Sequence, residues 1–182
     1  MDAFRPNRWK GLVLGTIGGI AGTIAMGYYW QAATALVGQD PRQETSDEPG
    51  ALDSISLVGK QHRDDESSTA ALGRIGYRAL AGAEPDGETK TTLSYLVHYG
   101  YGALTGGLYG ALRGAGPLLD LRGGAFFGIG LWLFGDELGV SLLGLAEGPT
   151  TYPPGQHAHR FGAHVAYGLG VAATTRLLHR LV

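Results

Sequence analysis

Four apolar stretches, each long enough to cross a lipid bilayer, constrain this chain of 182 residues more than any other feature. A membrane-spanning helix needs about 20 mainly apolar residues to cross roughly 30 Å of hydrocarbon. The stretches cover residues 11–37, 91–112, 123–146 and 157–178. The first two carry no Asp, Glu, Lys or Arg; Asp136 and Glu137 interrupt the third, and two arginines lie in the fourth. We therefore expect an all-α polytopic membrane protein with four transmembrane helices.

The basic residues between these stretches predict the orientation of the chain. Short cytoplasmic loops of membrane proteins are enriched in Lys and Arg. Basic residues lie before the first stretch, between the second and third, and at the C-terminus: Arg5, Arg8, Lys10, Arg113, Arg122, Arg176 and Arg180. The connection after the third stretch, GPTTYPPGQ, has neither Lys nor Arg. We expect a multi-pass protein of the bacterial inner membrane, with residues 1–10 and the C-terminus in the cytoplasm and residues 38–90 outside.

A basic start followed by an apolar run also describes a secretory signal peptide. The apolar run of residues 11–37 is much longer than the roughly 7–15 residues of a usual signal-peptide core. We therefore favour a retained transmembrane helix over a cleaved leader.

Residues 38–90 form the longest connection and contain eleven acidic and six basic residues. The part from 39 to 66 is polar and interrupted by proline, which is typical of an irregular acidic loop. Residues 67–83 show a helical pattern in which four apolar residues share one face: Leu72, Ile75, Ala79 and Leu80. This pattern predicts a short amphipathic helix lying on the membrane surface. The alternative is that the same face packs on the protein's own loop.

Glycine makes up 32 of the 182 residues and recurs at spacings of four inside the apolar stretches. Small residues let membrane helices approach each other closely, and packing is the main force that holds such helices together. The expected packing positions are Gly15, Gly19, Gly102, Gly106, Gly110, Gly128, Gly162 and Gly170. These stripes exceed what four helices need among themselves. We therefore expect a partner beyond the lipid bilayer, either another membrane subunit or a second copy of the chain.

Ionisable residues inside the apolar stretches form the candidate site. At 1.5 Å per residue, His98 lies roughly 10 Å and Asp136 roughly 15 Å below the outer surface. The expected intramembrane cluster consists of His98, Asp136, Glu137 and His164, with possible support from Tyr99, Trp132, His157 and Tyr167. Three interpretations fit: a structural polar clasp, a proton or ion path, or a haem or metal site on His98, His157, His159 or His164. No cofactor or metal is assigned.

Several classes of function are excluded by what the sequence lacks. There is no cysteine, so thiol nucleophiles, thiolate metal sites and disulfides are absent. The chain has no GxSxG, HExxH, phosphate-loop or dinucleotide motif. A formal net charge of −2 offers no basic field for nucleic acid. We expect a non-enzymatic structural or accessory subunit of a larger membrane complex, for example an energy-transducing one, with a small proton or ion channel or transporter as the alternative.

Three segments share a recognisable pattern. Residues 96–112 read LVHYGYGALTGGLYGAL, residues 130–145 read GLWLFGDELGVSLLGL, and residues 149–169 read PTTYPPGQHAHRFGAHVAYGL. Together they resemble the YagU-like bacterial inner-membrane proteins, a family of unknown function. The resemblance covers about residues 67–182. It implies a small multi-span inner-membrane protein with no assigned chemistry. The matching positions are His98, Tyr99, Trp132, Asp136, Glu137, Pro149, Tyr152, Pro153, His157, His164 and Tyr167.

Overall fold

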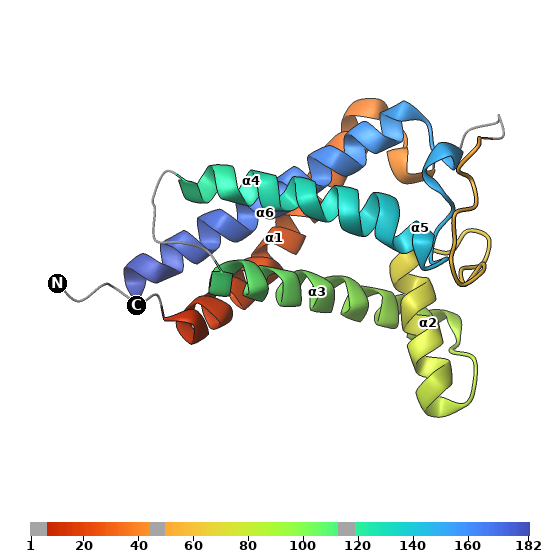
Figure 1. The fold of residues 1–182 in the computed structure, drawn as a ribbon, viewed down its shortest axis with the longest axis horizontal. Coiled ribbons are helices and arrows are strands. Elements are labelled where there is room, and N and C mark those ends of the chain that lie inside the picture. The colour runs from red at the N-terminus through yellow and green to blue at the C-terminus, as the bar shows by residue number, and fades with distance from the viewer. Residues whose placement is uncertain (1–6, 44–49, 113–118) are drawn as a thin grey trace.

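The computed structural model describes residues 7–43, 50–112 and 119–182. Arg5 and Arg113, which entered the orientation argument, lie outside these ranges. Within them the secondary structure is helical, which confirms the expected all-α class (Figure 1). The elements are α1 (Arg8–Val37), α2 (Ser68–Ala81), α3 (Gly87–Leu112), α4 (Leu119–Leu131), a π-helix (Trp132–Gly139), α5 (Val140–Leu142) and α6 (Pro154–Leu181). Two 3₁₀ turns cover Pro41–Gln43 and Pro149–Thr151.

The long helices pack in the order α3, α1, α6, α4, since the most extensive contacts are those of α1 with α3, of α1 with α6 and of α4 with α6. The start of α1, the end of α3, the start of α4 and the end of α6 lie at one end of the bundle (Figure 1). We call this the terminal end. The loop of residues 50–66, α2, α5 and the start of α6 lie at the opposite end, which we call the loop end.

Local signals set the ends of the helices. The side chain of Asn7 accepts a hydrogen bond from Lys10 N at the start of α1, and Gly38 closes that helix with a φ of 84°. Asp86 accepts from Thr89 N at 2.7 Å, so α3 begins at Gly87, earlier than the expected 91. The third segment ends at Leu142 instead of 146, because the chain turns at Gly144, whose φ is 65°.

Glycine lets α1 and α3 touch backbone to backbone. A Cβ atom built on Gly106 would lie 2.5 Å from Gly19 Cα and 2.6 Å from Gly15 O, closer than real Cβ atoms come. Gly110 faces the backbone of Gly11 and Gly15 in the same way, whereas Gly102 faces the side chain of Thr23. The close approach at this seam therefore depends on glycine at Gly15, Gly19, Gly106 and Gly110.

The remaining predicted packing glycines also face a neighbouring helix. Gly128 lies against the backbone of α6 at His164, Gly162 faces the ring of Tyr29, and Gly170 faces Gly22. All eight predicted glycines are thus occupied by contacts within the bundle. The reason given above for expecting a partner, a surplus of glycine faces, is wrong for these eight positions.

Small residues fill the interior and large apolar side chains point outward. Buried positions include Thr23, Ala33, Ala163, Ala172 and Thr175 along with the glycines, and only a few larger side chains such as Met26, Tyr167 and Val171 join them. Exposed side chains include Ile17, Ile24, Leu104, Leu108, Phe126, Phe134 and Leu177. This distribution is the reverse of that in a typical water-soluble helical bundle, where large aliphatic and aromatic side chains form the core.

By length and composition alone, two helical segments of the described residues are apolar enough to cross a membrane: Arg8–Val37 and Arg122–Leu142. They correspond to the first and third expected spans. Helices α3 and α6, with 26 and 28 residues, are long enough but less apolar. The expectation of four spans therefore stays a prediction.

Helix α2 lies at a steep angle to α3 at the loop end (Figure 1). It packs on α3 through its small residues, since Ala70, Ala71 and Gly73 are buried and Gly73 faces Leu93. Leu72 and Leu80 remain exposed. The packed face is therefore not the apolar face that the sequence pattern identified, and that apolar face is left mostly uncovered.

Candidate functional site

Glu137 is a buried carboxylate at the loop end of the bundle. It lies in the π-helix, whose wider turn is marked by a hydrogen bond from Val140 N to Gly135 O, five residues earlier. Such π-helical turns are rare and occur frequently at functional sites. Glu137 Oε1 accepts a hydrogen bond from Trp132 Nε1 at 2.8 Å and lies 2.8 Å from His157 Nδ1 of α6. The Glu137 site thus joins the third helical segment to α6.

The second nitrogen of His157 lies 3.0 Å from the carbonyl oxygen of Pro149. A backbone carbonyl only accepts, so His157 Nε2 carries a proton. The contact between His157 Nδ1 and Glu137 Oε1 then requires a further proton, either on the ring or on the carboxyl group.

The structure does not hydrogen-bond the four residues of the predicted cluster to one another. Asp136 has Arg160 as its basic neighbour, with 3.9 Å between Oδ2 and Nη1. His164 Nδ1 bonds to Arg160 O on its own helix at 2.8 Å. His98 lies within electrostatic range of His164 and Asp136 without bonding to either. Glu137 bonds to His157, which the sequence suggested only as a supporting residue.

The other supporting residues act separately. Tyr167 donates to Gly102 O at 2.6 Å and shares a 2.9 Å hydrogen bond with Thr105 Oγ1, so it ties α6 to α3. The ring of Tyr99 lies edge-on to that of His98, with centroids 6.1 Å apart. Of the four supporting residues, Trp132 and His157 belong to the Glu137 site, while Tyr99 and Tyr167 do not contact it.

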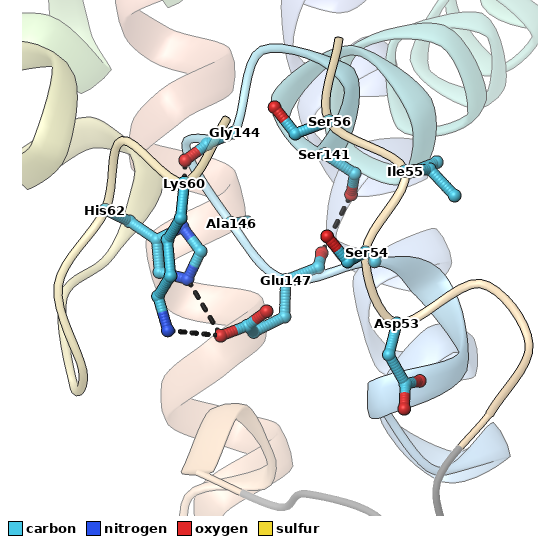
Figure 2. Close-up of a pocket in the computed structure, with 11 residues that line it drawn as sticks. Asp53, Ser54, Ile55, Ser56, Lys60, His62, Ser141, Gly144, Ala146 and Glu147 are labelled. Carbon is cyan, nitrogen blue, oxygen red and sulfur yellow. Dashed lines mark hydrogen bonds and ion pairs between the residues drawn. The ribbon is translucent and has the colours of Figure 1, made fainter. Parts of the chain in front are cut away.

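Sequence reasoning missed a clamp between the 50–66 loop and the turn after α5 (Figure 2). Gly144 O accepts from the backbone N–H groups of Gln61 and His62 at 2.8 and 3.0 Å, and it lies 2.8 Å from His62 Nδ1. Glu147 Oε1 lies 2.8 Å from Lys60 Nζ and 3.0 Å from His62 Nε2. The hydrogen bond from Lys60 lowers the pKa of Glu147. A cavity of about 30 Å³ lies among these side chains (Figure 2).

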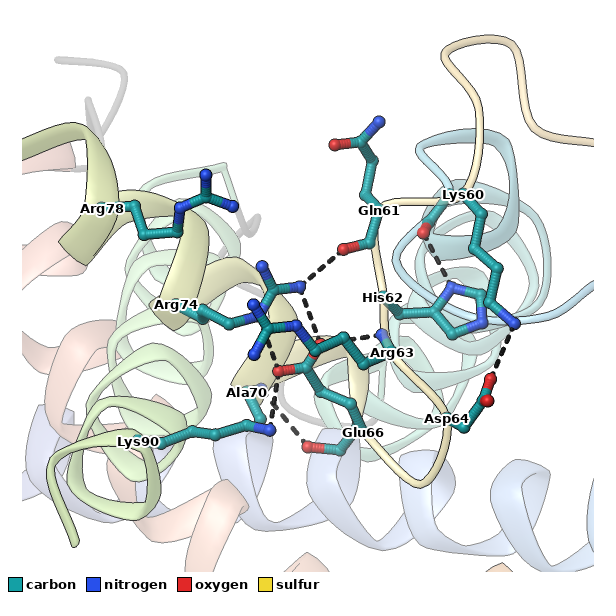
Figure 3. Close-up of polar contacts among 12 residues, drawn as sticks. Lys60, Gln61, His62, Arg63, Asp64, Glu66, Ala70, Arg74, Arg78 and Lys90 are labelled. Carbon is teal, nitrogen blue, oxygen red and sulfur yellow. Dashed lines mark hydrogen bonds and ion pairs between the residues drawn. The ribbon is translucent and has the colours of Figure 1, made fainter. Parts of the chain in front are cut away.

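A second missed group is the buried ion pair of Glu66 and Arg74 (Figure 3). The Glu66 side chain is 0% exposed and accepts from Arg74 Nε and Nη2 at 2.9 and 2.8 Å. Lys90 Nζ lies 2.9 Å from Glu66 Oε1, the oxygen that also accepts from Arg74 Nε. Hydrogen bonding from Arg74 is the main cause that lowers the pKa of Glu66 from 4.5 to about 2. The ion pair holds the loop, α2 and the start of α3 together.

One sequence signal was available for Arg74. It lies four residues after Ala70 and three after Ala71, on the small-residue face that packs on α3. An arginine on such a face requires an acid, and Glu66 precedes the helix by two residues. No local spacing links His62 to Glu147, because 85 residues separate them in the sequence.

Residues 7–43, 50–112 and 119–182 bring together no group of three or more His, Asp or Glu side chains able to hold a metal ion. What the described residues offer is a contacting imidazole and carboxyl pair at His157 and Glu137 and a polar clamp that fastens the 50–66 loop. Comparisons of the chain with protein-family models, with curated proteins and with solved structures find no match. The resemblance to the YagU-like family therefore stays a prediction.

Proposed function

We propose that this chain is a four-pass protein of the bacterial inner membrane, with both ends in the cytoplasm, and that it acts as a non-enzymatic accessory subunit. The observation that carries the proposal is the inverted distribution of side chains. Glycine, alanine and threonine fill the interior, while Ile17, Leu104, Phe126 and similar residues face outward. Water disfavours such a surface, whereas lipid hydrocarbon accommodates it.

The lengths of α3 and α6 support four spans. Their 26 and 28 residues correspond to roughly 39 and 42 Å at 1.5 Å per residue, more than the hydrocarbon thickness. Their lower apolarity comes from glycine, tyrosine, histidine and threonine, many of which face neighbouring helices. A polar group that faces another helix adds little to the cost of inserting the bundle.

The distribution of charge supports the orientation. Among the described residues, Arg8, Lys10, Arg122, Arg176 and Arg180 belong to the terminal end. At the loop end, several basic residues are paired with acids, as in the pairs of Lys60 with Glu147 and of Arg74 with Glu66. The exposed Leu72 and Leu80 and the steep angle of α2 suit a helix that lies in the membrane surface.

An accessory role fits the state of the polar groups. Glu137 is engaged with His157, whose second nitrogen faces the carbonyl oxygen of Pro149, and the seam between α1 and α3 is closed by backbone contact. Gly100 of α3 and Gly130 of α4 meet nothing within 4 Å. These two positions leave room for a helix of a partner subunit or of a second copy.

A proton path is the second candidate, favoured by the position of His98 within electrostatic range of both Asp136 and His164. Reconstitution into liposomes with an internal pH dye tests it. A proton flux that Asp136→Asn abolishes would support the path and contradict a purely accessory role. An equal proton leak from liposomes that hold the native chain and from those that hold the variant would exclude a proton path through Asp136.

Membrane topology is testable with single cysteines, because the native chain has none. Ser54→Cys in the outer loop, Val182→Cys at the C-terminus and the lipid-facing Leu108→Cys form a matched set. A membrane-impermeant maleimide should label Ser54→Cys only from outside intact cells and Val182→Cys only in inverted vesicles. Leu108→Cys should resist labelling from both sides. Labelling of Leu108→Cys as fast as the other two would show that the bundle is in water.

The accessory role is tested by the mass of the native protein extracted in mild detergent. We expect a complex larger than one chain. Introducing Gly100→Trp or Gly130→Trp should reduce that complex, while Leu104→Trp, at an exposed position that already carries a large side chain, serves as the control. A single-chain mass under all mild conditions would contradict the accessory role but leave the four-pass topology intact.

A further inference from the structure

Two imidazoles at the loop end have the same unusual surroundings, because each has an acceptor at both ring nitrogens. His157 faces Glu137 Oε1 at 2.8 Å and Pro149 O at 3.0 Å. His62 faces Gly144 O at 2.8 Å and Glu147 Oε1 at 3.0 Å, the latter as a charge contact that is not aligned as a hydrogen bond. A neutral imidazole has one N–H group and satisfies only one of two acceptors.

Both rings fasten the same piece of chain. Gly144 and Pro149 belong to the turn of residues 143–152, which connects α5 to α6. The hydroxyl of Ser141 bonds to Glu137 O at 3.1 Å and to Glu147 O at 2.8 Å, so it links the two sites. Two backbone hydrogen bonds hold the 50–66 loop against this region, one from Leu57 N to Leu142 O and one from Gly148 N to Asp53 O. We call the loop and the turn together the cap.

The other charged and titratable groups around the two rings do not supply the second proton that a neutral imidazole lacks. At His157, Tyr152 lies with its ring 6.3 Å away, and Arg160 stacks on Tyr152 at 4.1 Å. At His62, Lys60 shares Glu147 Oε1 and also bonds to Asp64 at 3.0 Å. Trp132 donates to Glu137 Oε1, the same oxygen that His157 Nδ1 faces, and so supplies no proton to the ring. Each ring nitrogen that faces a carboxylate therefore depends on its own proton, or on one held by that carboxyl group.

We propose that the cap is a pH-sensitive element: it is closed when His62 and His157 are protonated and loosens when they lose their protons. The closed form binds more protons than the open form, so its stability falls as pH rises. Histidine changes charge between about pH 5 and 8, the range in which the cap should respond. Loosening separates the 50–66 loop from the turn and widens the cavity of about 30 Å³ between them. On the proposed topology the cap faces outward, so it would respond to the acidity outside the cytoplasm.

A nitroxide spin label at Leu57→Cys tests the proposal in detergent micelles, since Leu57 is exposed while its backbone is docked on the bundle. Between about pH 5 and 8 the mobile fraction of the label should rise about tenfold, as expected for the loss of a charge-assisted hydrogen bond. The double variant His62→Gln with His157→Gln should remove this pH dependence. His98→Gln, which changes an imidazole outside the cap, should keep it.

An unchanged spectrum across this range in the otherwise native chain would overturn the proposal, and so would a pH response that survives the double variant. Should the double variant fail to fold, the single variants decide, because each should reduce the response and neither should abolish it. The micelle measurement does not depend on sidedness. A cytoplasmic location of residue 54 would refute the topology and leave the pH response standing, with the cytoplasm as the compartment sensed.

Discussion

Replacing Gly106 by alanine should separate α1 from α3. The added Cβ would lie 2.5 Å from Gly19 Cα, 2.6 Å from Gly15 O and 2.7 Å from Gly19 N. Carbon atoms in contact prefer about 3.5–4.0 Å, so the helices must move apart by about 1 Å along this seam. All three neighbours are backbone atoms, and no rotamer change relieves the clash. Overpacking of this kind costs about 1–3 kcal/mol, and the rigid surroundings favour the upper end.

The helix propensity of alanine offsets part of this cost. Alanine exceeds glycine by about 1 kcal/mol inside a helix, which leaves a net loss of about 2 kcal/mol for Gly106→Ala. Gly100→Ala is the matched control in the same helix, because its Cβ meets nothing within 4 Å. The control should gain about 1 kcal/mol, so the two variants should differ by about 3 kcal/mol.

The assay is reversible unfolding in mixed micelles of increasing SDS content, followed by helical circular dichroism. Gly106→Ala should unfold at lower SDS than the native chain and Gly100→Ala at equal or higher SDS. Equal stability of the two variants would refute the backbone contact between α1 and α3, and with it the packing order of the bundle.

Three further predictions concern the loop end. The pKa of Glu66 is lowered to about 2, so its pairing with Arg74 contributes stability above pH 4.5 that is lost as pH falls toward 2. The shift corresponds to about 3 kcal/mol. Hydrogen exchange of the α2 region, measured as the pH is lowered, should show this loss in the native chain but not in Glu66→Gln. Gly144→Ala should loosen the cap, because the φ of 65° strains alanine and its Cβ would clash with Gly59 O. We expect faster proteolysis of the 50–66 loop with unchanged SDS unfolding, and a loop as resistant to protease as in the native chain would contradict the clamp. Trp132→Phe removes a donor from buried Glu137 and should cost about 1–3 kcal/mol, whereas Trp9→Phe, at an exposed position, should cost little; equal effects on SDS unfolding would count against the Glu137 site.

The sequence predicted the helical elements well because their signals are local. The apolar stretch of residues 11–37 corresponds to α1, and the pattern over 67–83 corresponds to α2 at Ser68–Ala81. The boundaries that differ depend on single residues, such as Asp86 at the start of α3 and Gly144 after α5. A cap or a positive φ moves a helix end by several residues without changing its apolar pattern.

The candidate site was predicted in its residue types but not in its pairing. Depth along a helix suggested that His98 and His164 would meet the two carboxylates. In the structure, Glu137 turns toward His157 instead, because the π-helix changes the register of the third segment. The sequence pattern assumed a regular helix there and could not supply this rotation.

The sequence by itself determined that this chain is helical, rich in glycine seams and asymmetric in charge between its ends, since these properties depend on residue type and on neighbours within one or two turns. Only the tertiary structure decided that α1 lies between α3 and α6, that Arg74 is buried on Glu66, and that His62 meets Glu147. Those contacts depend on which helix faces fit together at backbone distance, and the fit is a property of the whole bundle.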